Sequence, residues 1–196
     1  MTSETVKSVD QLREILERSK VNTNEWTKSV NDLYDEIHSG ESSIKEDNIL
    51  LFDLSDDWKG DLVRKVRVAI VTCAYECPES GEKYELYEDK QVLSDGTIKR
   101  RGFNHISEKK KKSETSVDAA KRGLSEELGI NEIDNERLVF IQRHAKYGQS
   151  QSYPGIDNIY VIYEFLYDME PKFYREEYVE VQKDKSTYFK WRKIEE

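Results

Sequence analysis

The chain has 196 residues and a formal net charge of -9 at pH 7, from 31 Lys and Arg against 40 Asp and Glu. This length suits one domain of ordinary size with an extension and excludes two large domains. The acidic balance argues against general nucleic-acid binding, because surfaces that follow phosphate backbones carry an excess of Lys and Arg. Hydrophobic residues make up 36% of the chain, with 12 Tyr, 6 Phe and 3 Trp, so we expect a buried core.

Cysteine use and hydropathy indicate a cytoplasmic protein. Cys73 and Cys77 are the only cysteines, and we interpret them as two reduced thiols. No apolar run approaches the roughly 18 residues that a membrane helix needs. The N-terminal residues MTSETVKSVD lack the apolar core of a signal peptide. We therefore expect no membrane partner.

Two amphipathic helices are predicted to form an N-terminal extension over residues 1–60. The first covers residues 8–19 with Ser8 as its N-cap, and the second covers about 28–38 and ends before Gly40. Their apolar stripes are, in turn, Val9, Leu12, Ile15 and Leu16, and Val30, Leu33, Tyr34 and Ile37. The domain boundary is expected near the apolar residues 49–52 and the turn-rich residues 55–61. A homodimer through these helices is one hypothesis.

The main domain is predicted over residues 61–196. From Arg64 the apolar pattern changes to a period of two, which is typical of a strand, and Asp95-Gly96 indicates a hairpin turn. Strands are expected at about 64–72, 83–93, 97–103, 138–143, 159–166 and 186–194. With one helix between residues 114 and 130, the pattern predicts an α+β or mixed α/β fold.

That helix combines an apolar stripe with an acidic face. Thr115 or Ser116 can cap its start and Gly129 its end, and the stripe consists of Val117, Ala120, Leu124 and Leu128. Gly123, Glu126 and Glu127 fall at i, i+3 and i+4, so they share the opposite face. A solvated acidic surface is the common explanation of two neighbouring glutamates, but the surrounding spacing favours a functional site.

The spacing resembles the Nudix box, G-x5-E-x7-R-E-U-x-E-E-x-G-U, in which U is a bulky aliphatic residue. Seven of its nine defined positions agree in this chain. They are Glu114, Arg122, Leu124, Glu126, Glu127, Gly129 and Ile130. The preceding residues SEKKKKSE are similar to the family's GGKxxxGE loop, and the strands from Arg64 onward extend the resemblance over about 130 residues.

The resemblance implies a Nudix-like mixed β-sheet carrying a loop-helix-loop that binds a divalent cation, Mg²⁺ or Mn²⁺. In the family this cation binds the diphosphate of a nucleoside diphosphate derivative, and oxygen ligands suit it. Glu126 and Glu127 would then bind metal and take part in catalysis. Glu114 would support the metal site, and Arg122 would orient a carboxylate.

Two departures from the box bear on activity. Gly123 stands where the family has a glutamate that binds metal or positions water, and Glu108 stands where it has the opening glycine. Glycine within a helix costs about 0.8 to 1.0 kcal/mol relative to alanine, so close packing against Gly123 is one explanation. Glu108 either alters the loop or adds its carboxylate as a metal ligand. Carboxylates outside the box that could compensate are Glu164, Glu177 and Glu180.

Two further groups of residues have open interpretations. Arg100, Arg101 and Lys109 lie in a basic stretch before the box and are candidates for binding the phosphates of a ligand, or they belong to a charged edge strand and a solvated loop. The aromatic residues around the loop YGQSQSYPGIDN either stack on a base or are structural. They are His144, Tyr147, Tyr153 and Tyr160.

Two functions of different classes follow. The first is a metal-dependent hydrolase that cleaves the diphosphate linkage of a nucleoside diphosphate derivative, based on Arg122, Glu126 and Glu127. The second is a catalytically impaired Nudix-fold module that binds a nucleotide ligand or a protein partner, based on Gly123 and Glu108. In both, the expected ligand is a nucleotide-type small molecule.

Overall fold

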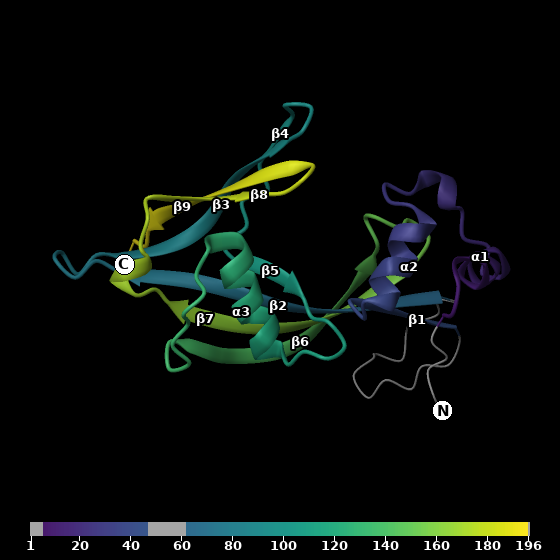
Figure 1. Ribbon diagram of the computed structural model, residues 1–196, viewed down its shortest axis with the longest axis horizontal. Helices are drawn as coiled ribbons and strands as arrows, with labels where there is room; N and C mark the ends of the chain where they lie inside the picture. The colour runs from purple at the N-terminus through teal and green to yellow at the C-terminus, as the bar shows by residue number, and fades with distance from the viewer. Residues whose placement is uncertain (1–5, 47–61, 196) are drawn as a thin grey trace. The chain divides into compact units, whose positions relative to one another are not determined.

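The computed structural model describes residues 6–46 and 62–195, which fall into two compact units (Figure 1). Unit 1 comprises Met1–Val68, Lys109–Glu114 and His144–Ile162. Unit 2 comprises Ala69–Glu108, Thr115–Arg143 and Tyr163–Glu196. Unit 1 therefore combines the predicted extension with three segments that the sequence pattern assigns to the main domain, 61–68, 109–114 and 144–162. The apolar residues 49–52 and the turn 55–61 lie outside the described residues.

Both N-terminal helices form as predicted, α1 at Val9–Arg18 and α2 at Val30–His38. Ser8 caps α1 by accepting a hydrogen bond from the backbone N–H of Gln11 at 3.1 Å. Ser29 and Asp32 form a capping box at the start of α2, in which each side chain accepts from the other residue's backbone N–H. A 3₁₀ helix, η1 at Thr23–Glu25, connects them.

The apolar stripes of α1 and α2 are buried inside unit 1. Leu12, Leu16, Leu33 and Ile37 pack with Tyr153 and Ile156 from the 144–162 segment. Trp26 packs at the edge of this core. Its ring lies edge-on to that of Tyr153 with 4.8 Å between the ring centroids, and its Nε1–H donates to the Pro154 carbonyl at 2.9 Å. A dimer partner would therefore meet the polar faces of these helices, and dimerisation stays a prediction.

Within the described residues, nine strands form the sheet, which with three α-helices confirms the predicted mixed α/β class (Figure 1). The strands are β1 (Ser42–Glu46), β2 (Leu62–Glu76), β3 (Lys83–Leu93), β4 (Ile98–Lys99), β5 (Ile106–Lys109), β6 (Leu138–Gln149), β7 (Asp157–Asp168), β8 (Glu177–Val181) and β9 (Lys185–Lys193). Their order is β6-β7-β2-β3-β9-β8, with β1 and β5 pairing with β2 and β4 with β3. A 3₁₀ helix, η2 at Pro171–Phe173, precedes β8.

The strands differ from the predictions mainly where side chains override the alternating pattern. The strand predicted at 97–103 is reduced to the two residues of β4, and the Arg100 and Arg101 side chains that follow it pair with Asp89 and Glu88 on β3. The short strands β1, β5 and β8 were not predicted, since sequences such as SSIKE carry too few apolar residues to show a period.

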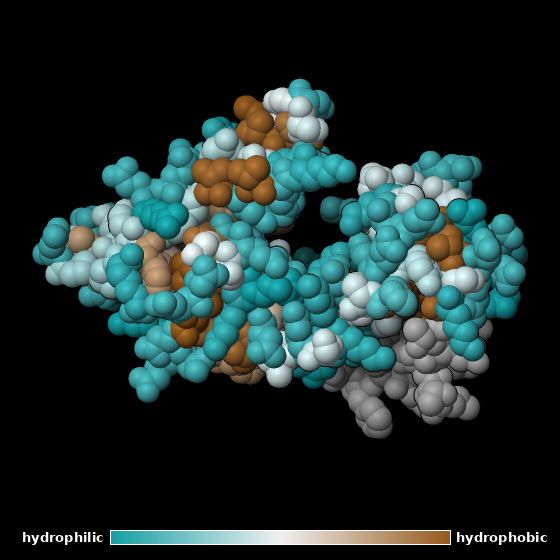
Figure 2. Space-filling view, viewed as in Figure 1, coloured by the Kyte–Doolittle hydropathy of each residue, from teal (hydrophilic) through white to brown (hydrophobic). Residues whose placement is uncertain are grey.

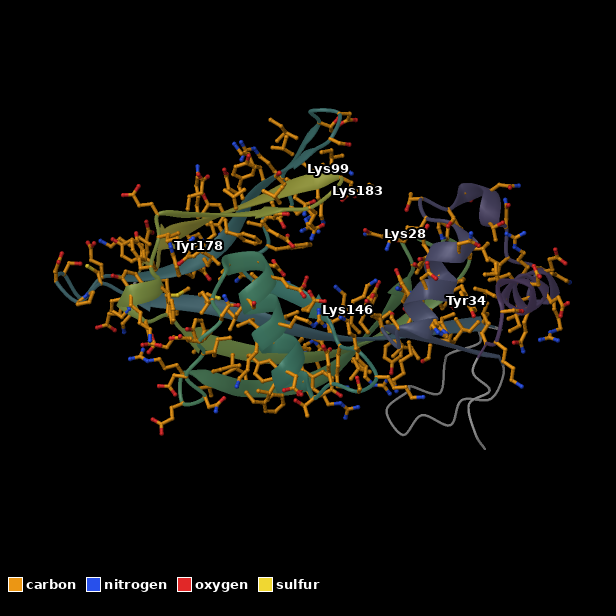
Figure 3. All side chains as sticks on the ribbon, viewed as in Figure 1. Lys28, Tyr34, Lys99, Lys146, Tyr178 and Lys183 are labelled. Atoms are coloured by element: carbon orange, nitrogen blue, oxygen red, sulfur yellow. The ribbon has the colours of Figure 1, made fainter. Side chains whose placement is uncertain are left out.

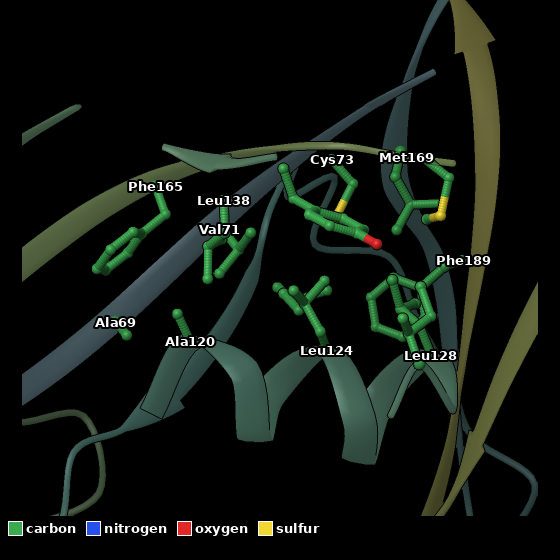
Figure 4. Close-up of a cluster of buried hydrophobic side chains, with 14 of the residues drawn as sticks. Ala69, Val71, Cys73, Ala120, Leu124, Leu128, Leu138, Phe165, Met169 and Phe189 are labelled. Atoms are coloured by element: carbon green, nitrogen blue, oxygen red, sulfur yellow. The ribbon is translucent and has the colours of Figure 1, made fainter. Parts of the chain in front are cut away.

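Helix α3, Ser116–Leu128, packs against the sheet strands of unit 2. Figure 4 shows Ala120, Leu124 and Leu128 pointing from the helix towards Val71 and Phe189. The prediction that Val117 belongs to this stripe is wrong, because Val117 lies in the first turn and is 39% exposed. Ala119 takes its place in the core.

The two cysteines do not form a disulfide bond. Cys73 and Cys77 are both free thiols, as predicted, with Cys73 buried in the core of unit 2.

No helix within residues 6–46 or 62–195 is long and apolar enough to cross a membrane. The face in Figure 2 is largely hydrophilic with separate apolar patches, and Ile98, Val179 and Val181 are among the exposed apolar side chains of unit 2.

The position of α3 predicts a contrast between two truncations on the same helix. Leu124→Ala should lower the free energy of unfolding by about 2 to 5 kcal/mol, because Leu124 is fully buried and its loss leaves a cavity. Val117→Ala should change it by less than about 0.5 kcal/mol. Urea unfolding measures both values, and equal losses would contradict this packing.

Candidate functional site

Both ends of α3 are fixed by local hydrogen bonds, which position its polar face. At the start, Thr115 and Asp118 form a capping box with N···O distances of 3.1 and 2.9 Å. At the end, Gly129 adopts φ +70°, and its N–H donates to the Ser125 carbonyl at 3.0 Å. The helix therefore begins and ends where the box predicts.

Arg122 lies between two carboxylates in unit 2. Its guanidinium is 2.7 Å from Glu108 Oε1 and 3.6 Å from Glu126 Oε2. The three side chains come from β5 and from one face of α3. Arg122 therefore pairs with two carboxylates, and one of them belongs to the residue that replaces the opening glycine of the box.

The two departures from the box lie in contact with each other. Gly123 is buried, and a Cβ built on it would lie 3.2 Å from Glu108 Cβ and 3.6 Å from Ile106 Cδ1. The methylene stem of Glu108 therefore passes over the space that a side chain at position 123 would enter. The contact explains the helical glycine, because a larger residue there would have to displace the stem of Glu108.

Glu127 is the most strongly perturbed carboxylate of unit 2. Burial is the main cause that raises its pKa well above the usual range, and the negative charges of Glu180, Glu108 and Glu88 raise it further. The backbone N–H of Ser107 opposes this shift by donating to Glu127 Oε1 at 3.3 Å. The charges of three other carboxylates thus act on Glu127, and the Ser107 hydrogen bond offsets only part of their effect.

One of the three carboxylates considered outside the box belongs to this cluster. Glu180 lies on the face of β8 that also carries the buried Tyr178, and its charge acts on Glu127. Glu177 points to the other face, where it lies 3.8 Å from Lys190 Nζ. Glu164 accepts a hydrogen bond from Gln142 at 2.6 Å. Of these three carboxylates, Glu180 is therefore the one whose charge acts on Glu127.

Sequence reasoning missed Glu88. This residue is buried, and its negative charge contributes to the raised pKa of Glu127. Arg101 holds it through a two-pronged ion pair, with Nε donating to Glu88 Oε1 at 2.9 Å and the second contact to Oε2. The sequence does contain a signal for Glu88, since it follows the buried Leu86 by two residues on a strand. An acidic residue in a core-facing position calls for a functional explanation or a cation partner.

The three predicted phosphate-binding residues all have carboxylate partners within their own units. Arg100 pairs with Asp89 at 2.7 Å, and Arg101 pairs with Glu88. Lys109 lies 2.9 Å from Glu36 Oε1 in unit 1. A ligand phosphate would have to compete with these carboxylates, so their role in binding stays a prediction.

Glu114 and the aromatic loop have local roles in unit 1. Glu114 closes the turn before α3, because its carboxylate accepts from the Lys111 N–H at 2.8 Å. Tyr153 is fully buried, and its hydroxyl donates to Glu36 at 3.2 Å, which supports the structural interpretation of this tyrosine. Tyr160 accepts from Asn158 at 2.9 Å. His144 and Tyr147 lie on β6.

The carboxylate cluster suits a divalent cation by its chemistry. Its donors are oxygens, and a cation would offset the negative charges of Glu180, Glu108 and Glu88 that, after burial, raise the pKa of Glu127. As the side chains stand, no three His, Cys, Asp or Glu residues in the described part of the chain converge closely enough to hold an ion. A pocket of about 390 Å³ opens on the flank of α3, and Arg122 and Glu126 line it together with Lys121 and Ser125.

The raised pKa of Glu127 predicts a pH dependence in the metal-free protein. A glutamate titrates near about 4.3 in an unfolded chain, and Glu127 releases its proton at higher pH when folded. The unfolded state therefore binds fewer protons in this window, so stability falls as pH rises from about 4.3 towards the folded pKa. Glu127→Gln should remove this fall and raise Tm near neutral pH in the presence of EDTA. An unchanged pH profile would contradict the shift, and Glu126→Gln serves as the control.

Neither a protein-family model nor a curated protein matches the chain. Among solved structures, it is similar to a MutT/nudix family protein from Enterococcus faecalis, with a TM-score of 0.46 and 14% identity over 92% of this chain and 56% of that one. It is also similar to the Ap4A hydrolase of C. elegans, with a TM-score of 0.36 and 12% identity over 65% of this chain and 79% of that one.

A third similar structure is the NUDIX domain of Shewanella oneidensis NrtR in complex with ADP ribose. Its TM-score is 0.37 and its identity 8%, over 65% of this chain and 71% of that one. Two of these three structures, those from Enterococcus faecalis and Shewanella oneidensis, carry the Nudix name. At these identities the similarity concerns the fold, and any activity has to be argued from the site.

Proposed function

We propose that this chain is a hydrolase that cleaves the diphosphate linkage of a nucleoside diphosphate derivative with a divalent cation, Mg²⁺ or Mn²⁺. The observation that carries the proposal is the position of Glu108. Its stem packs on Gly123, and its carboxylate pairs with Arg122 at 2.7 Å beside the acidic cluster. Glu108 would thus supply from β5 the carboxylate that the family's box supplies from position 123 of the helix.

Each residue of the cluster has a defined part in this proposal. Glu108, Glu126 and Glu127 would hold the cation, with Glu180 contributing from β8. When bound, the cation would neutralise phosphate charge and lower the pKa of a water molecule. Arg122 orients Glu108 and Glu126. The positive charge of a bound cation would also offset the burial and the acidic neighbours that destabilise the charge of Glu127.

The second candidate is a nucleotide-binding module without hydrolytic activity, and one observation favours it. Arg122 engages both Glu108 and Glu126, so a cation would have to compete for these two carboxylates. A chain that binds the cation weakly could still recognise a nucleotide. The pocket beside α3, at about 390 Å³, falls within the usual size of small-ligand sites.

A residue exchange tests the hydrolase proposal. Hydrolysis is measured with Mg²⁺ or Mn²⁺ on nucleoside diphosphate sugars, dinucleoside polyphosphates and nucleoside triphosphates. We expect Glu108→Gly to lose about 10- to 100-fold in activity, since it removes a carboxylate from the metal site. Gly123→Glu alone should also lose activity, because its side chain would meet the Glu108 stem. The double variant Glu108→Gly, Gly123→Glu returns the carboxylate to the helix and should recover activity.

Two results would count against this assignment. Turnover no faster in the wild type than in Glu127→Gln, on every substrate, would end the hydrolase proposal. A double variant with less activity than both single variants would show that Glu108 does not replace a carboxylate at position 123.

The binding proposal predicts stabilisation without turnover. A nucleotide at 100 times its Kd should raise the free energy of unfolding by about 2.7 kcal/mol, because it binds only the folded chain. Thermal unfolding with the same ligands, in EDTA and in Mg²⁺, measures this gain. The module proposal requires a shift with at least one nucleotide and equal shifts in wild type and Glu127→Gln. The absence of any shift would refute it.

A further inference from the structure

The loop between β5 and α3 is held by the N-terminal extension. Residues Lys109–Glu114 belong to unit 1, together with α2. Lys109 Nζ lies 2.9 Å from Glu36 Oε1 on α2 and 3.5 Å from Glu41 Oε2 just after it. The sequence has four consecutive lysines, Lys109–Lys112, which we call the lysine run. Its first residue, Lys109, therefore has two carboxylate partners in the N-terminal extension.

Glu36 is buried and has several partners besides Lys109. Its side chain is only 8% exposed, and it pairs with Arg64 and with Lys28 Nζ at 2.9 Å. Ser42 and Tyr153 donate to it at 2.9 and 3.2 Å. Burial alone would raise the pKa of Glu36, but these cations and Lys109 hold it well below the usual range, so the carboxylate stays charged. Figure 3 shows Lys28 and Tyr34 on this part of the chain.

A second contact fixes the loop further along. Gly40 follows α2 with φ +80°, and a Cβ at this position would lie 2.5 Å from Lys112 Cβ and 2.9 Å from the Lys112 backbone nitrogen. The backbone of the lysine run thus passes directly over Gly40, which only glycine permits. Between the two contacts, the Lys110 N–H donates to the Arg67 carbonyl at 2.8 Å.

We propose that α2 and the turn after it are a positioning element for the loop that opens the box. The loop is joined covalently at both ends to residues of the candidate site, since Glu108 precedes Lys109 and the helix cap Thr115 follows Glu114. Fixing Lys109 and Lys112 therefore limits how far Glu108 and the start of α3 can move. A solvated lysine run would need neither a buried carboxylate nor a glycine beneath it.

The effect on hydrolysis rests on the proposed function, whereas the effect on the loop does not. The first readout is therefore independent of activity. Trypsin cleaves after lysine, and its access to Lys109–Lys112 depends on local opening of the loop. Mass spectrometry of the products gives the cleavage rate within this run.

Gly40→Ala is the main variant, and Gly96→Ala is its matched control. Gly96 has nearly the same backbone angle, φ +84°, but a Cβ there would meet nothing within 4 Å. Both variants carry similar backbone strain, but only in Gly40→Ala would the new Cβ clash with Lys112. We expect Gly40→Ala to speed cleavage at the lysine run by about tenfold or more, a free-energy change of about 1.4 kcal/mol for loop opening. Gly96→Ala should cleave at the wild-type rate.

Glu41→Gln is a second variant in case Gly40→Ala fails to fold. It removes one carboxylate partner of Lys109 and leaves the buried contacts of Glu36 in place. Faster cleavage at Lys109, with Tm unchanged, supports the proposal. Equal cleavage rates in wild type, Glu41→Gln and any folded Gly40→Ala would overturn it.

The second readout is the Mg²⁺ concentration at half-maximal hydrolysis. If the loop positions Glu108, Gly40→Ala should raise this concentration by about 10-fold or more, whereas Gly96→Ala should not. An inactive wild type would refute the proposed hydrolase while the cleavage rates still decide the role of α2. A normal Mg²⁺ response in a Gly40→Ala protein with a cleavable loop would overturn the positioning role.

Discussion

The contact between Glu108 and Gly123 is the constraint on which the candidate site depends. A glycine inside a helix weakens it, and here the missing side chain makes room for the stem of a glutamate from the neighbouring strand. Arg122, the residue before Gly123 in the helix, pairs with the carboxylate of Glu108 at an N–O distance of 2.7 Å. Under the proposed function, the two departures from the box would be one local change, in which a strand supplies the carboxylate in place of the helix.

A second buried ion cluster organises unit 1. The carboxylate of Glu36 forms ion pairs with Arg64, Lys28 and Lys109, which come from three different parts of the chain. Removing one partner of a buried ion pair commonly costs about 3 to 5 kcal/mol, so the cluster strongly favours one arrangement of these segments. Through Lys109, this arrangement includes the loop that begins the box.

Much of the fold follows from local sequence signals. Ser8 and Gly129 mark helix ends through caps that act over three or four residues, and the bounds predicted for β3, residues 83–93, agree with the structure. The exposure of Val117 and the shortening of β4 could not be predicted in this way. They depend on which side the sheet covers and on arginines that bind acids about a dozen residues away.

The site was predictable in its residue types and not in its contacts. Spacing alone brings Arg122, Glu126 and Glu127 onto one helix, because helical geometry is periodic. The contact of Glu108 with Gly123, and the approach of Glu180 and Glu88 to Glu127, depend on strand pairing and register, which a single sequence does not encode in any short pattern. Sequence and structure together therefore define the cluster.

The most direct test of the central claim is the affinity of the protein for Mn²⁺, measured by electron paramagnetic resonance without any substrate. Glu108→Gln keeps the stem that packs on Gly123 and removes only the charge. If Glu108 replaces the missing carboxylate, this variant should bind Mn²⁺ about 10- to 100-fold more weakly than the wild type. Equal affinity in the two proteins would contradict the account.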